Sequence, residues 1–322
     1  MTKKIMAISL IGCFLALGAF TAHAQAYPNK PIHLVVPYAV GGANDQVARV
    51  IAAELQTSMN QSVVVENKPG AGGVVGTTYA TKAAPDGYTL VVGEPGAISI
   101  NPRLTKTPAY DPVKDLIPVA SLSEVQMLVV ANPATKINSL KDLASYGKGK
   151  NISYGSAGTG TAQHLTMELL KHTMHLEMTH IPYRGGAPAM TDLIGGQIPI
   201  LPITLPTAIS QIKAGQIVPI AALTRTRSAA LPNLPTAAEQ GYPSLNVSIW
   251  QGIFVPAGTP QPIVDKLGAE IRKALADPET RKRLTNQGLE ILDMPREQFV
   301  SLVNKDIARW KDVIQQSNLT TQ

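Results

Sequence analysis

The sequence predicts an α/β fold that is built on parallel sheets and divided into two lobes. Short apolar runs typical of strands alternate with segments in which apolar residues recur at helical spacing, and turns rich in Gly and Pro separate them. The 322 residues are 44% hydrophobic, so the chain can bury a large core. Because single cores stop growing near roughly 250–300 residues, we expect two lobes instead of one.

The first 26 residues have the pattern of a secretory signal peptide. Lys3 and Lys4 precede an apolar segment at 5–20, and the small-residue sequences AHA and AQA offer cleavage sites. The apolar segment is shorter than the roughly 20 residues that a membrane-spanning helix needs. We therefore expect the leader to be removed and the mature chain to be secreted.

Cys13, the only cysteine, lies in this leader. It ends a LIGC tetrad that looks like a lipoprotein cleavage box, but the apolar run before it is short and a second one follows. This order favours an ordinary signal peptide over lipidation. The mature chain has no thiol, which excludes disulfides, cysteine nucleophiles and thiolate metal sites.

The charge of the mature chain argues against a nucleic-acid partner. Loss of the two leader lysines lowers the net charge from +6 to +4. The basic residues are scattered and aromatic residues make up 5% of the chain, whereas a nucleic-acid groove needs clustered Lys and Arg. A mild positive charge suits a small anionic ligand.

Strand-then-helix units follow one another through most of the mature chain. Each predicted strand is a short apolar run, and each predicted helix has apolar residues at helical spacing. The predicted strands lie at 32–36, 62–66, 88–93, 127–133 and 152–155. The predicted helices lie at 45–59, 74–84, 139–146, 161–172 and 187–196.

From Thr259 onward the chain is predicted to be largely helical. Pro260, Pro262, Pro278 and Pro295 lie at or near the expected helix starts, where the missing N–H of proline would be unpaired anyway. Such a helical tail usually packs back on a sheet that has already formed.

Two glycine-rich loops, each between a predicted strand and a predicted helix, are candidate ligand sites. Their glycines allow a close backbone approach, and each helix start offers free N–H groups and a partial positive charge. Two such starts facing one cleft would clamp a carboxylate; the alternative is a pair of ordinary turns. The candidate residues of the first glycine loop are Tyr38, Gly41, Gly42, Ala43, Asn44 and Asp45. Those of the second glycine loop are Ser156, Ala157, Gly158, Thr159, Gly160 and Thr161.

Enzyme and metal motifs do not match. Tyr154 stands where a G-x-S-x-G motif needs glycine, no Walker loop exists, and GAGGVVG at 70–76 has the wrong spacing for a dinucleotide fingerprint. The closely spaced His172, His175 and His180 lack an HExxH motif, so we expect exposed or capping residues and no metal.

Two further residues keep two interpretations each. His164 lies in the first turn of the predicted helix after the second glycine loop, where it either donates to a bound anion or caps the helix. Trp250 lies in an apolar run and either packs in a core or hinge or forms a wall of a pocket.

Taken together, these motifs resemble one known family along essentially all of 27–322: the periplasmic solute receptors of tripartite tricarboxylate transporters, or Bug-type binding proteins. The matching segments occur in the family's order. They are YPNKPIHLVVPYAVGGANDQVAR, VVVENKPGAGG, KAAPDGYTL, INPRL, YGSAGTGTAQHL, PYRGGAPAMTDLIGGQ and FVPAGTP.

The resemblance implies a two-lobed periplasmic-binding-protein fold, the type II Venus flytrap, with a helical C-terminal tail. Lobe 1 would comprise 27–127 and 249–322, and lobe 2 would comprise 128–248. The two glycine loops would grip a carboxylate in the cleft between the lobes, largely through backbone groups and ordered water. The implied protein is a monomer in the periplasm that needs no cofactor or metal, catalyses no reaction and serves a two-subunit membrane transporter.

Two departures from the family, and one arginine within a matching segment, bear on the ligand. Ile203 and Thr204 stand where relatives often carry an aspartate that could pair with an amine, which disfavours an α-amino acid and favours an apolar ligand body, either aromatic or a longer chain. Glu94 replaces a small hydroxyl residue and either points to solvent or accepts from an amine, amide or hydroxyl of the ligand. Arg184 either binds a second carboxylate bidentately or caps the next helix.

Two other functions stay open from the sequence. A receptor of this kind can instead report ligand to a membrane histidine kinase, and neighbouring genes for two membrane subunits would favour transport. A periplasmic enzyme acting on organic acids would need a nucleophile paired with a base, and the sequence offers none that can be assembled.

Overall fold

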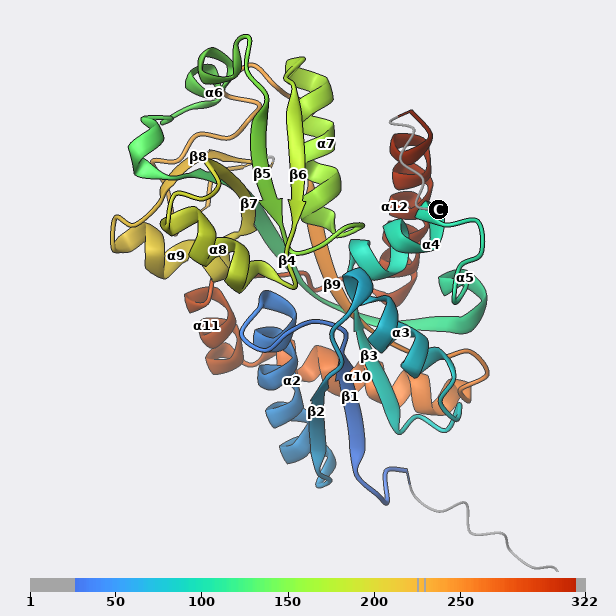
Figure 1. Cartoon of the computed structure of the whole chain (residues 1–322). Coiled ribbons are helices and arrows are strands. Elements are labelled where there is room, and N and C mark those ends of the chain that lie inside the picture. Colours follow the sequence, from blue (N-terminus) through green and yellow to red (C-terminus); the bar gives the residue numbers. More distant parts are fainter. Residues whose placement is uncertain (1–26, 225, 229, 317–322) are drawn as a thin grey trace, which may run out of the picture.

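The computed structural model describes residues 27–224, 226–228 and 230–316. The predicted signal peptide and the lipoprotein alternative at Cys13 lie outside the described residues. Figure 1 shows two lobes, with the first strands and the C-terminal helices in one and the middle of the chain in the other. Among the described helices, none combines the length and the apolar character that a bilayer crossing requires.

Lobe 1 is built on a mixed sheet. β1 pairs in parallel with β2 on one side and β3 on the other, and β9 then runs antiparallel between β3 and β4. β10 adds a short antiparallel edge to β4. These strands are β1 (Ile32–Val36), β2 (Val63–Asn67), β3 (Thr89–Gly93), β4 (Leu116–Ala131), β9 (Ser248–Pro256) and β10 (Leu289–Ile291).

Lobe 2 repeats the parallel arrangement on a second sheet. β5 pairs in parallel with β6 and β7, and both β7 and β8 run antiparallel to the last part of β4. These strands are β5 (Ile152–Ser156), β6 (Met178–Pro182), β7 (Ile200–Thr204) and β8 (Val218–Ala222). The expectation of purely parallel sheets therefore holds for the strand–helix units, whereas β4, β8 and β9 are antiparallel.

The long strand β4 connects the two lobes. Its residues up to Gln126 pair with β9, and from Met127 onward they pair with β7. The change of partner supports the predicted lobe boundaries at 127/128 and 248/249, which we keep as a proposal.

Helices cover both sheets (Figure 1). In lobe 1 they are α2 (Ala43–Met59), α3 (Val74–Thr81), α4 (Asn101–Leu104), α5 (Pro112–Asp115), α10 (Gln261–Ala276), α11 (Pro278–Asn286) and α12 (Arg296–Gln316). In lobe 2 they are α6 (Leu140–Gly147), α7 (Ala162–Met174), α8 (Gly186–Ile194) and α9 (Leu205–Lys213). Single turns occur at η1 (Ala71–Gly73), η2 (Gly96–Ile100) and η3 (Pro133–Thr135).

The predicted helical tail is confirmed and packs on lobe 1. Pro260 precedes α10 directly, and Pro278 is the first residue of α11. α10 contacts α2 and β4, while α12 contacts η2 and β4. Phe299 and Trp310 of α12 are fully buried, and burial of such a side chain contributes about 1.5–3 kcal/mol to folding, so the tail is part of the core.

Candidate ligand cleft between the lobes

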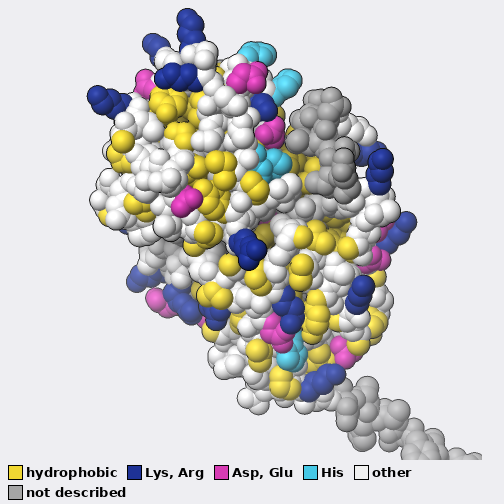
Figure 2. Space-filling model, in the orientation of Figure 1, with side chains coloured by type: hydrophobic (Ala, Val, Ile, Leu, Met, Phe, Trp, Pro, Cys, Tyr) yellow, Lys and Arg dark blue, Asp and Glu magenta, His cyan; other side chains and the backbone are white. Residues whose placement is uncertain are grey.

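A cleft of about 770 Å³ lies between the lobes, and both glycine loops line it. Lobe 1 also contributes residues 69–73, and lobe 2 contributes residues 182–188. Among the described lining residues, Glu94 is the only acid and Arg184 the only base. Figure 2 shows acidic and basic side chains scattered over the displayed face of the molecule instead of gathered into one charged patch.

Twelve of the eighteen predicted residues line the cleft, and six lie behind it. The lining residues are Tyr38, Gly41, Gly42, Ala43, Asn44, Glu94, Ala157, Gly158, Thr159, Arg184, Ile203 and Thr204. The residues behind it are Asp45, Ser156, Gly160, Thr161, His164 and Trp250. Ligand contact itself stays a prediction for all of them.

Asp45 fixes the first glycine loop from inside. Its side chain is 3% exposed and accepts hydrogen bonds at 3.0 Å from the Gly41 N–H, the Asn67 amide and the Arg49 guanidinium. Burial opposes ionisation, but these donors together hold the pKa of Asp45 below its ordinary value. The N-cap of α2, Gly42, provides no side-chain cap, so the first N–H groups of the helix stay available to an anion.

A chain of side chains behind the second glycine loop holds its backbone. Thr161 caps α7 by accepting from the His164 N–H and donates its hydroxyl to the Gly158 carbonyl at 2.7 Å. His164 Nδ1 accepts from the Gly160 N–H at 3.2 Å. His164 is thus turned toward its own loop and supports the capping interpretation, since it does not line the cleft.

His164 is stacked on His180, a residue for which we predicted an exposed or capping position. The ring centroids are 3.9 Å apart with an interplanar angle of 17°, and His180 Nε2 is hydrogen-bonded to the Ser156 hydroxyl at 2.6 Å. His180 is therefore not the exposed or capping residue that we predicted, whereas His172 and His175 are exposed. Burial lowers the pKa of both stacked histidines to about 4, so they are neutral near pH 7.

Alternation along β9 decides the position of Trp250. Successive side chains of a strand point to opposite faces, and Ile249 and Gln251 line the cleft while Trp250 points away. The indole donates to Asp306 at 3.0 Å and packs on the Phe254 and Phe299 rings. Trp250 therefore belongs to the core of lobe 1 and forms no wall of the cleft.

Two amides that the sequence analysis missed hold the loops in place. Gln251 donates to the Asn44 side chain at 2.6 Å and itself accepts from Ser123. The Asn101 amide of lobe 1 donates at 2.9 Å to the carbonyls of Gly72, Gly96 and, in lobe 2, Gly160. Asn101 thus joins both lobes at the edge of the cleft; its motif, INPRL, carried the family resemblance but indicated no partner.

Glu94 lies inside the protein and not in solvent. Its side chain is 4% exposed and accepts from the Tyr38 hydroxyl. Burial raises the pKa of Glu94, while the Tyr38 hydroxyl and the N–H groups of Gly96 and Ala97 act in the opposite direction. The solvent-facing alternative is wrong, because η2 folds the side chain against the first glycine loop.

Arg184 lies at the lip of the cleft in the loop before α8. The side chain is exposed and forms no hydrogen bond or ion pair with any described residue. Gly185 is the N-cap of α8, and no side chain caps this helix start. The interpretation of Arg184 as a helix cap therefore has no contact to support it. Ile203 and Thr204 end β7 at the cleft, and the Thr204 hydroxyl is bonded to Thr207 at 3.0 Å.

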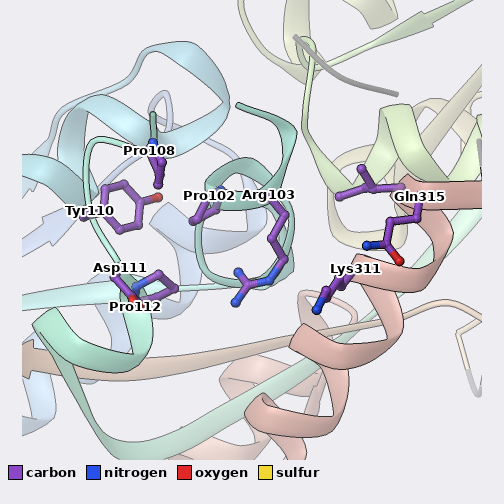
Figure 3. Close-up of a pocket in the computed structure, with 9 residues that line it drawn as sticks. Pro102, Arg103, Pro108, Tyr110, Asp111, Pro112, Lys311 and Gln315 are labelled. Carbon is purple, nitrogen blue, oxygen red and sulfur yellow. The ribbon is translucent and has the colours of Figure 1, made fainter. Parts of the chain in front are cut away.

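A second hollow of about 390 Å³ lies on lobe 1 between α4, α5 and the last turns of α12. Figure 3 shows Arg103 and Lys311 pointing toward the same space, with three prolines around it. Asp111 also lines this hollow, and Arg103 donates to two backbone carbonyls of η2. Neither glycine loop reaches it, so the candidate site is the cleft between the lobes.

Comparison with known proteins identifies the family. The family described as the tripartite tricarboxylate transporter family receptor matches residues 47–319. The chain belongs to this receptor family. The Bug-type resemblance is thereby confirmed. The members of this family are solute-binding proteins and not enzymes.

Three solved structures are similar to this receptor over most of its length. The periplasmic binding protein BugD is 36% identical, with a TM-score of 0.86 and coverage of 92% of this chain and 100% of BugD. Rpa4515 of R. palustris, solved with adipate, is 33% identical, with a TM-score of 0.87 and coverage of 91% and 98%. MatC of Rhodopseudomonas palustris, solved with malate, is 34% identical, with a TM-score of 0.84 and coverage of 89% and 100%. These matches confirm the two-lobed periplasmic-binding-protein fold.

Proposed function

We propose that this receptor captures a small organic carboxylate in the periplasm and delivers it to a two-subunit tripartite tricarboxylate-type membrane transporter. The family match and the adipate and malate of two relatives support this proposal. The observation that carries it is that two glycine loops from different lobes line one cleft. Closure of the lobes would replace the water bound to a carboxylate by fixed N–H donors.

The lining also favours a certain ligand body. Val125, Ile203 and Ile249 give the cleft an apolar wall, which suits an aliphatic or aromatic chain attached to the carboxylate. Because Ile203 and Thr204 provide no carboxylate for an α-amino group, we expect α-amino acids to bind weakly. Both loops come from one chain, so a monomer suffices to build the site.

A thermal-shift screen of the mature protein, followed by calorimetry, tests capture. The panel holds aliphatic and aromatic mono- and dicarboxylates, α-amino acids, sugars and phosphates. A ligand at about 100 times its dissociation constant should stabilise the folded state by about 2.7 kcal/mol and raise the midpoint by several degrees. We expect shifts confined to carboxylates; a shift with sugars or phosphates alone would contradict the proposal.

The hydrogen-bonded pair of Ser156 and His180 near the site does not favour an enzyme. Ser156 is fully buried, neither Ser156 nor His180 lines the cleft, and the low pKa of His180 makes it a weak base. We therefore expect a bound carboxylate to be recovered chemically unchanged after long incubation, as chromatography and mass spectrometry would show. Uptake by vesicles that contain both membrane subunits should require the loaded receptor.

A further inference from the structure

Glu94 places a buried acid in a cleft that we expect to bind an anion. It is the only acidic side chain among the lining residues that the structure describes. Among the described residues, none of the ion pairs involves Glu94. Capture of a carboxylate alone does not require such a group, and a negative charge beside it is unfavourable.

The acid is held in a fixed position by donors. The Tyr38 hydroxyl donates a hydrogen bond to Glu94, and the nearby N–H groups of Gly96 and Ala97 favour its ionised form. A carboxylate has about four acceptor sites, so the hydrogen bond from Tyr38 leaves acceptor capacity for a ligand. Tyr38 belongs to the first glycine loop, which couples the acid to the loop that faces the ligand.

The groups around Glu94 make an added donor favourable. The titratable side chains that interact with Glu94 include Asp306 of α12, Tyr38 and Tyr110. Burial and the Asp306 charge both raise the pKa of Glu94. The ionised acid is thus short of favourable partners in the empty cleft, and a donor on the ligand would supply one.

We propose that Glu94 determines specificity by selecting carboxylates that carry a second group with a hydrogen-bond donor, which is either a hydroxyl or an ammonium placed beyond the α-carbon. This inference rests on the proposed function, because it assumes that the glycine loops hold the carboxylate. The ligand carboxylate lies at the starts of α2 and α7, and the hydroxyl or ammonium of the ligand donates to a free acceptor site of Glu94.

Calorimetry with matched ligands tests the selection. The panel consists of butanoate, pentanoate and hexanoate, their terminal hydroxy and terminal amino derivatives, and the pair succinate and malate, which differ by one hydroxyl. The wild-type protein should bind at least one donor-bearing member about tenfold more tightly than its unsubstituted parent, since a hydrogen bond to a charged group contributes on this scale. The amino and hydroxy arms distinguish an ammonium from a hydroxyl ligand.

Glu94→Gln removes the charge and nearly keeps the shape. It should abolish the preference for the amino derivatives and weaken that for the hydroxy derivatives, while the unsubstituted acids should bind at least as tightly as to the wild-type protein, because a negative charge beside their carboxylate is removed. Glu177→Gln, at an exposed position of lobe 2, is the charge-matched control and should keep the wild-type ranking. Survival of the preference in Glu94→Gln would overturn the inference.

A measurement on the wild-type protein keeps the test valid if that variant does not fold. The ligand carboxylate raises the pKa of Glu94 by like-charge repulsion, whereas a ligand donor lowers it by favouring the ionised acid. Calorimetry of one ligand pair in two buffers of different ionisation enthalpy should therefore show fewer protons taken up with the donor-bearing member than with its parent. Equal proton exchange for both would overturn the inference.

Failure of the inference and failure of the proposed function look different. If carboxylates bind but a donor brings no gain in the wild-type protein, only the role of Glu94 is wrong. If no carboxylate binds at all, the proposed function fails and the inference fails with it.

Discussion

At the scale of single residues, we expect Asp45 to affect binding although its side chain does not line the cleft. Asp45→Ala would leave the Gly41 N–H, the Asn67 amide and the Arg49 guanidinium without their common acceptor. Buried donors without partners cost about 1–3 kcal/mol, so the free energy of unfolding should fall by about 2 kcal/mol and carboxylate affinity about tenfold. Urea unfolding and calorimetry measure these changes. Asp312→Ala, at an exposed position of α12, is the control, and unchanged affinity in Asp45→Ala would contradict the role.

Arg184 is the residue whose effect should depend on the ligand. Its exposed guanidinium has no partner in the described structure and can bind a second carboxylate at the lip of the cleft. We expect Arg184→Ala to weaken dicarboxylates several-fold more than monocarboxylates in calorimetry. The control is Arg272→Ala, which removes an exposed cation from α10. Equal losses for both ligand classes would show that Arg184 acts only by long-range attraction of its positive charge for any anion, and not by binding a second carboxylate.

At the scale of elements, the stacked histidines link the start of α7 to pH. Their pKa values of about 4 lie below the ordinary 6.5, so the unfolded chain binds more protons between these limits. The contribution of the two neutral histidines to the free energy of unfolding should therefore be fully present above about pH 6.5 and be lost as the pH falls toward 4. Protonation turns His164 Nδ1 from an acceptor into a donor, so its hydrogen bond from the Gly160 N–H is lost. This loss should weaken carboxylate binding.

Unfolding midpoints in urea between about pH 7 and pH 4.5 test this dependence. His164→Gln should flatten the decline, because a neutral side chain replaces a titrating one. His172→Gln removes an exposed histidine from the same helix and should leave the slope unchanged. A slope that is identical in all three proteins would assign the acid sensitivity to other groups.

The elements also show why some site residues were predictable and others were not. Glycines and hydroxyls between a strand and a helix are a local pattern, so Gly42, Gly158 and Thr159 were recognised from the sequence. Gln251 was missed and Trp250 was placed in two ways, because nothing local fixes which face of β9 meets the cleft. His180 was misplaced because its partner, the Ser156 hydroxyl, comes from the neighbouring strand.

At the scale of the whole molecule, the sequence predicted two α/β lobes and a helical tail but not how the sheets join. The strand–helix alternation indicates parallel pairing, whereas β4 and β9 are antiparallel. The switch of β4 from β9 to β7 depends on strands that are far apart in the chain. The same holds for the residues 69–73, which line the cleft and whose turn η1 packs against η2.

The contact between the lobes makes a prediction about kinetics. Asn101 offers one amide to carbonyls of both lobes, and the bond to Gly160 exists only while the lobes meet at this edge. Asn101→Ala should therefore destabilise the closed form, raising the ligand dissociation rate about tenfold while the association rate changes less than about threefold. Stopped-flow competition measures both rates. Asn151→Ala, which removes an exposed amide bonded within lobe 2, is the control. An unchanged dissociation rate in Asn101→Ala would mean that closure depends on the ligand and the glycine loops alone.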